Sequence, residues 1–121
     1  MVRFSIRQTG EIFVIELEGR LLLAEGVNKV QELFSELLGR NAVSVLMDLN
    51  HISQIDAAGV GTLVFGYVTF RRRGGEFKLA CSEMPVKRVL EIVRINKVIE
   101  IYPDRESAFE SFNTRAFGQA E

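Results

Sequence analysis

The segment VSVLMDL, residues 43–49, is short and almost wholly apolar. Side chains of a strand alternate between its two faces, so a strand with no polar face must be covered on both sides. Such runs are typical of the centre of a parallel sheet, whose strands are joined by crossover helices. The segment therefore predicts an α/β fold in which these residues form a central strand.

The rest of the chain supplies the partners that this sheet requires. Two stretches around the turn signal Gln8-Thr9-Gly10 predict an antiparallel hairpin. Ser82 and Asp104 are the predicted N-caps of the last two helices. Further strands are expected at residues 76–81 and 98–102, and helices at residues 24–39, 57–73, 82–93 and 104–112. We predict a mixed β-sheet of about five strands and about four helices, which pack mainly on one face of the sheet and around its ends.

The size and composition suit one domain. The chain has 121 residues, of which 47% are apolar, enough for a single core. We place the domain at residues 1–113 and a C-terminal tail at residues 114–121. Acidic and basic side chains nearly cancel, to a net charge of −1, so the composition gives no case for binding nucleic acid or an anionic membrane.

Cysteine usage and hydropathy indicate the compartment. Cys81 is the only cysteine, which excludes an internal disulfide and a multi-cysteine metal site and favours a reducing environment. The N-terminus lacks the pattern of a signal peptide, and no apolar run approaches the roughly 20 residues that cross a bilayer as a helix. We expect a cytoplasmic protein without direct membrane insertion.

The stretch ISQIDAAGVGTLVF, residues 52–65, connects the apolar strand to the second helix. Asp56 is placed to accept hydrogen bonds from two N–H groups of the first helical turn. Ala57 and Ala58 are small helix formers, and Gly59 and Gly61 permit close approach of another backbone or a ligand. This corner is therefore a candidate binding site.

The second helix also has an unusual outer face. At about 100° per residue, its core side comprises Val60, Leu63, Val64 and Tyr67. The opposite side then comprises Ala58, Thr62, Phe65 and Thr69. Because this side is small, neutral and carries a phenylalanine, it indicates a docking surface; the alternative is that Phe65 packs against a neighbouring loop or helix.

Three passages resemble the STAS domain family of bacterial anti-sigma-factor antagonists and sulphate transporters. They are GEIFVIELEGRL, VLMDLNHISQIDAAGVGTLV and RRRGGEFKLACSEMPVKRVLEIVRINKVIEIYPD, which cover nearly the whole domain. The second is similar to the family pattern of an apolar strand ending in Asp-Leu, a short loop and Asp-Ser-Ser/Thr-Gly. The resemblance implies a STAS-like fold.

The resemblance also implies a function. In the antagonists, the second hydroxyl residue of that motif is phosphorylated by an anti-sigma factor that is also a serine kinase, and phosphorylation releases the complex. Asp56 and Gly59 match the motif, whereas Ala57 and Ala58 occupy the two hydroxyl positions. Ala58 cannot accept a phosphoryl group and its charge of about −2. We expect a non-catalytic antagonist that binds such a partner without this switch.

The partner-binding residues are expected to be Asp56, Ala57, Ala58, Gly59, Thr62, Phe65 and Thr69. No cofactor, metal or nucleic acid is expected, and a homodimer is possible.

Other interpretations remain open at this stage. The chain could be a regulatory subunit of a membrane transporter, a signalling scaffold, or a sensor of small anions or nucleotides that uses the helix start. His51, the only histidine, could then serve as a base or ligand, although a polar loop residue is the simpler interpretation. Ser53 and Thr62 are nearby hydroxyls that could replace the missing phosphoryl acceptor.

Overall fold

The computed structural model describes the backbone of residues 2–42 and 44–120, and the side chains of these residues up to Phe112. Five strands form one sheet in the order β1-β2-β3-β4-β5. The strands are β1 (Arg3–Thr9), β2 (Ile12–Leu21), β3 (Ser44–Ile55), β4 (Phe77–Ala80) and β5 (Ile101–Tyr102). β1 and β2 are antiparallel, and the other pairs are parallel. The predicted mixed sheet and opening hairpin are confirmed.

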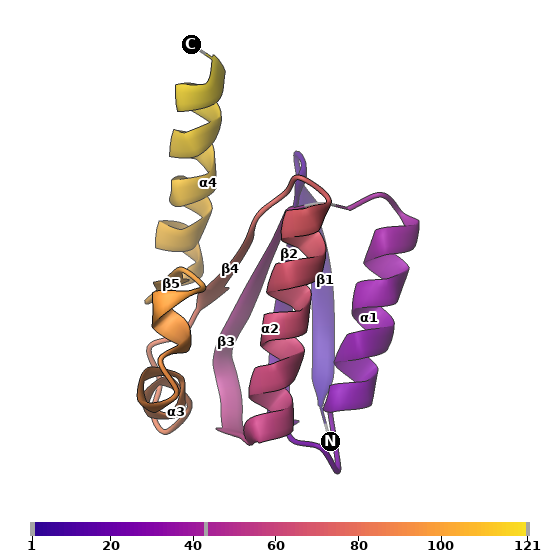
Figure 1. Ribbon diagram of the computed structural model, residues 1–121, viewed down its shortest axis with the longest axis vertical. Coiled ribbons are helices and arrows are strands. Elements are labelled where there is room, and N and C mark those ends of the chain that lie inside the picture. The colour runs from indigo at the N-terminus through magenta and orange to yellow at the C-terminus, as the bar shows by residue number, and fades with distance from the viewer. Residues whose placement is uncertain (1, 43, 121) are drawn as a thin grey trace.

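Four α-helices and one 3-10 helix connect and cover the strands. They are α1 (Val27–Gly39), α2 (Ala57–Arg72), α3 (Val86–Ile92), the 3-10 helix η1 (Ile95–Lys97) and α4 (Arg105–Ala120). Figure 1 shows α1 and α2 side by side over the same face of the sheet. None of the helices in the described part of the chain combines the length and hydropathy that crossing a membrane requires.

β3 is the middle strand, as the apolar run predicted. Its residues alternate between two separate clusters of buried side chains. Val45, Met47 and Leu49 join the large core beneath α1 and α2, whereas Leu46 joins a smaller cluster with Ala108 and Phe112 of α4. α4 therefore covers part of the second face, which the expectation of helices mainly on one face did not anticipate. The apolar side chain of Leu46 explains why this face needs a cover.

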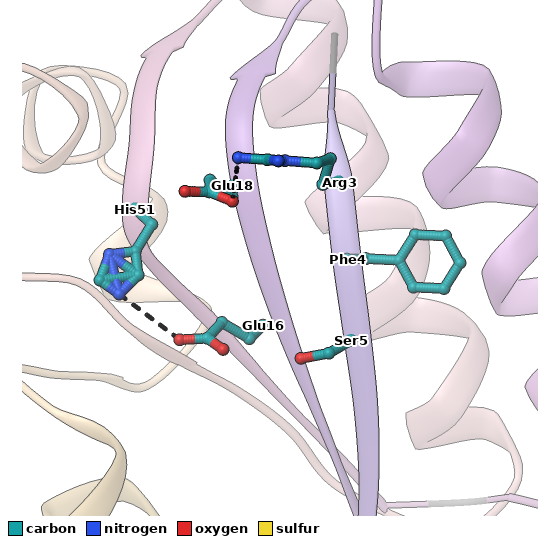
Figure 2. A pocket seen from close by; sticks show the side chains of 6 residues that line it. All are labelled: Arg3, Phe4, Ser5, Glu16, Glu18 and His51. Carbon is teal, nitrogen blue, oxygen red and sulfur yellow. Dashed lines mark ion pairs between the residues drawn. The ribbon is translucent and has the colours of Figure 1, made fainter.

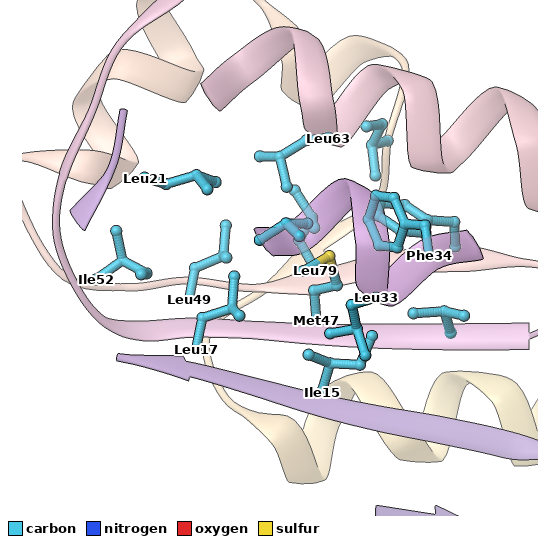
Figure 3. Close-up of a cluster of buried hydrophobic side chains, with 14 of the residues drawn as sticks. Ile15, Leu17, Leu21, Leu33, Phe34, Met47, Leu49, Ile52, Leu63 and Leu79 are labelled. Carbon is cyan, nitrogen blue, oxygen red and sulfur yellow. The ribbon is translucent and has the colours of Figure 1, made fainter. Parts of the chain in front are cut away.

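The large core fills the space between the sheet, α1 and α2. Figure 3 shows Leu33 and Phe34 of α1 and Leu63 of α2 converging on Met47 and Leu79 of the sheet.

Three aromatic rings pack against one another within this core. The Phe34 ring centroid lies 5.7 Å from that of Phe70 and 5.9 Å from that of Phe77. Gly66 of α2 faces the rings, and an added Cβ would lie 2.8 Å from atoms of Phe34 and Phe77. Only glycine lets α2 approach this closely.

A buried lysine joins α4 to the sheet. Lys78 of β4 is 2% exposed, and its Nζ donates a hydrogen bond to Ser111 Oγ at 2.7 Å. The same atom forms ion pairs with Glu76 and Glu100, each at 3.2 Å, and lies 4.7 Å from the Phe112 ring centroid. The buried charge is thus compensated by carboxylates and a hydroxyl, as burial of an ammonium group requires.

Two boundaries near the candidate site differ from prediction. The central strand was expected to end at Leu49, with His51 in a loop, but β3 continues to Ile55 because β2 runs beside it as far as Leu21. The pairing shifts register twice along this part of the ladder. α1 begins at Val27 rather than Ala24, since residues 22–25 form a tight turn closed by hydrogen bonds between the backbones of Leu22 and Glu25.

The last third of the chain also differs from prediction. Ser82 does not cap α3; its N–H donates instead to Asn50 Oδ1 at 2.7 Å, and the helix begins at Val86. The final strand, expected at residues 98–102, is limited to Ile101–Tyr102, because the N–H groups of Val98 and Ile99 bind the Ile95 carbonyl at the end of η1. α4 continues to Ala120, past the expected end at Phe112, and the boundary at residue 113 between domain and tail stays a prediction.

Candidate protein-binding surface

Asp56 holds two segments together at the start of α2. Its Oδ1 accepts a hydrogen bond from the Gly59 N–H, and its Oδ2 accepts one from the Leu23 N–H, both at 2.9 Å. One predicted helix donor is therefore found, and the second oxygen binds the β2–α1 loop instead. The hydrogen bonds from Leu23 and Gly59 lower the pKa of the Asp56 carboxyl. The ionised side chain thus fixes the shape of this corner.

Gly59 does not lie on the surface, contrary to the prediction that it meets a partner. A Cβ at this position would collide with the Leu21 carbonyl oxygen and lie 2.7 Å from the Ile55 side chain. The close approach that this glycine permits is therefore to β2 and β3 of its own chain. Ala57 is exposed, whereas Ala58 is half-buried and packs against the large core.

The exposed face of α2 differs in part from the predicted one. Phe65 is 51% exposed, as expected for an outward residue. Thr62 is only 2% exposed, and its Oγ1 donates to the Ala58 carbonyl at 3.0 Å, so its predicted place on the outer face is wrong. Its hydroxyl is also hidden from any phosphorylating enzyme. Thr69 is half-buried.

The side of α2 that is buried differs from the side predicted at 100° per residue, because the helix packs against the rest of the domain through its smallest residues. Gly59, Thr62 and Gly66 are buried, which brings the helix close to Leu21 and the Phe34 ring. Five of the exposed residues then form one continuous line, in which successive members are three or four positions apart. We call this line the α2 stripe: Ala57, Gly61, Phe65, Val68 and Arg72.

Two exposed apolar residues of this region were missed by the sequence analysis. Leu23 is 71% exposed, and its backbone is tied to Asp56, so it lies beside the start of α2. Val68 is 39% exposed on the α2 stripe. The available signal was the run Leu21-Leu22-Leu23 at the end of a strand, since alternation cannot bury three successive side chains on one face.

His51 is remote from this corner. His51 lies five residues before Asp56 on β3, which pairs with β2 as far as Ile55. At about 3.3 Å per residue of extended chain, His51 and Asp56 are roughly 16 Å apart. His51 lines a shallow depression of about 320 Å³ on the sheet, together with Arg3, Phe4, Ser5, Glu16 and Glu18. Figure 2 shows its ring pointing toward the Glu16 carboxylate. Its Nε2 lies 3.4 Å from Glu16 Oε2, and Arg3 pairs with Glu18 at 2.8 Å. The structure therefore does not bring His51 to the helix start.

The other singled-out residues occupy ordinary structural positions. Ser53 is exposed on β3, where its Oγ donates to the Gly19 carbonyl at 3.3 Å. Cys81 is buried, and burial raises the pKa of its thiol, in agreement with a packing role. No group of three or more metal-ligating side chains occurs among the residues that the structure describes.

The fold and the exposed start of α2 define a small α/β domain in which the second helix follows a central parallel strand. The family model of the STAS domain matches residues 3–108, and the chain belongs to this family. A candidate anti-sigma factor antagonist of Thermotoga neapolitana is 28% identical over 82 residues, which cover 68% of this chain and 73% of that protein.

Solved structures show the same fold. A candidate anti-sigma factor antagonist of Thermotoga maritima superposes with a TM-score of 0.82 at 20% identity, over 89% of this chain and 92% of that one. The anti-sigma factor antagonist SpoIIAA, solved in its unphosphorylated form, gives a TM-score of 0.69 at 19% identity, over 96% of this chain and 99% of that one. The Bacillus SpoIIAA has also been solved in a phosphorylated form.

Proposed function

We propose that this protein is an anti-sigma factor antagonist that binds its partner through the start of α2 and the α2 stripe. The observation that carries the proposal is the exposure of Leu23, whose backbone is held by Asp56, and of Phe65, about two and a half turns along α2 from Asp56. Large apolar side chains that remain exposed beside a fixed backbone are suited to act as anchors in a protein interface. The names of the relatives supply the class of partner, an anti-sigma factor.

The roles of the predicted residues follow from their positions. Asp56 and Gly59 shape the corner from within, and Ala57 and Ala58 leave room for a partner's backbone. Phe65 supplies the main apolar contact, with Thr69 at the edge of the surface. Thr62 supports the helix from its buried side and touches no partner.

In the function that we propose, phosphorylation at position 58 cannot release the partner, because it cannot occur there. Ala58 has no hydroxyl, and Thr62, one turn away, is covered. A partner of the serine-kinase type would therefore find no accessible hydroxyl in the first turns of α2, whereas Ser53 stays exposed on β3. The repulsive charge that releases a phosphorylated antagonist would not form at position 58.

The test is to mix the purified protein with each serine-kinase anti-sigma factor encoded near its gene and to measure binding by calorimetry. We expect one stable complex, weakened at least tenfold by Phe65→Ala, because loss of a central aromatic anchor costs about 2 kcal/mol or more. Phe4→Ala is the matched control, since Phe4 is 38% exposed but lies on β1. Failure of all these partners to bind, while another STAS protein of the same cell binds one, would remove the proposal.

A further inference from the structure

The α2 stripe ends in positive charge that nothing along the helix balances. Residues 57–73 contain three successive arginines, Arg71, Arg72 and Arg73, and no acidic residue. α1, which lies beside α2, instead mixes both signs on its exposed positions, with Lys29, Glu32 and Glu36. A surface helix normally carries such mixed polar residues on its solvent side. The exposed side of α2 is therefore apolar along most of its length and purely basic at its C-terminal end.

The arginines are available to another molecule. All three are exposed, and the Arg71 guanidinium lies over the Tyr67 ring at 5.6 Å from its centroid. Within the described part of the chain, Arg72 and Arg73 form no ion pair, although other exposed arginines do, such as Arg3 with Glu18.

Arg72 belongs to the same surface as the apolar anchors. It follows Phe65 by seven residues and Val68 by four, so all three side chains project from one side of α2. The favourable effect of cations on a helix C-terminus accounts for charge in the last turn. It does not account for the lack of any acid along the helix, nor for the exposed phenylalanine and valine in line with the charge.

We propose that the partner surface covering the α2 stripe is acidic where it meets the end of the helix. The partner places an apolar ridge over Phe65 and Val68 and at least one carboxylate within reach of Arg72. This inference rests on the proposed function, because it assigns the chemistry of the partner at the same surface. Charges at the rim of an interface act mainly on the association rate and its dependence on salt.

The experiment measures association rates of the anti-sigma factor identified above, in 0.1 M and 0.5 M salt. Arg72→Glu is expected to slow association about tenfold at the lower salt concentration, with a weaker effect at the higher one because salt screens surface charge. Arg7→Glu is the matched control: Arg7 is also exposed but lies on β1, and the change in net charge is the same. Arg72→Gln removes the positive charge without placing a negative charge at the C-terminal end of the helix dipole. Its association rate is expected to lie between those of the wild type and Arg72→Glu.

The outcomes separate the two proposals. If the wild-type chain binds none of the anti-sigma factors, the proposed function fails and this inference fails with it. If the wild-type chain binds and Arg72→Glu associates as fast as Arg7→Glu, the acidic partner surface is wrong while the proposed function stands. A wild-type association rate that does not change with salt would contradict the inference in the same way.

Discussion

At the scale of single residues, Asp56 explains why the corner keeps its shape without a hydroxyl beside it. One carboxylate oxygen caps α2 and the other holds the β2–α1 loop that carries Leu23. A capping residue usually serves the helix alone. Here the same side chain also positions an exposed leucine, so the corner that we propose for binding is held in shape although Ala58 has no hydroxyl.

The pH dependence of stability should show this role. The two backbone hydrogen bonds lower the pKa of Asp56 below its value of 3.8 in the unfolded chain. Because the folded pKa is lowered, the ionised carboxylate stabilises the fold at pH values above 3.8. This contribution decreases as the pH falls from 3.8 through the lowered pKa of the folded chain. Asp56→Ala should therefore lower the thermal midpoint at pH 7, and its difference from the wild type should shrink by pH 3. A constant difference across this range would contradict the role of the ionised form.

At the scale of elements, two glycines of α2 lie in opposite environments. Gly66 faces the rings of Phe34 and Phe77, whereas Gly61 lies on the exposed side, with no atom within 4 Å of an added Cβ. The two positions form a matched pair in one helix.

Alanine substitutions should separate these two glycines. Gly66→Ala should lower the free energy of unfolding by about 1 to 3 kcal/mol, because the methyl group overpacks the core. Gly61→Ala should raise it by about 0.5 to 1 kcal/mol, because alanine favours the helix where space is open. Urea denaturation measures both. Equal effects of the two substitutions would show that α2 does not pack as described.

These residues also explain what the sequence alone could predict. The apolar run at residues 43–49 predicted the central strand because its composition is a property of that segment. The rotation of α2 could not be predicted in the same way, since Thr62 is buried through the close approach that Gly59 and Gly66 permit. Similarly, β3 extends to Ile55 only because β2 pairs with it. Contacts between distant segments decided both features.

At the scale of the whole molecule, the two faces of the sheet have different tasks. α1 and α2 cover one face and present the start of α2 and the α2 stripe. On the other face, α4 is fixed by the buried Lys78 and a small apolar cluster. The proposed protein-binding surface and the helix that covers the second face of the sheet thus lie on opposite sides of one small domain.

We propose that this domain binds its partner permanently because position 58 cannot be phosphorylated. The most direct measurement is the affinity for a serine-kinase anti-sigma factor, before and after incubation of the mixture with ATP, for the wild type and for Ala58→Ser. We predict that the wild-type affinity does not change and that residue 58 stays unmodified, whereas Ala58→Ser becomes phosphorylated and is released. Release of the wild-type chain after addition of ATP, or a docked kinase that leaves Ala58→Ser unmodified, would contradict the account.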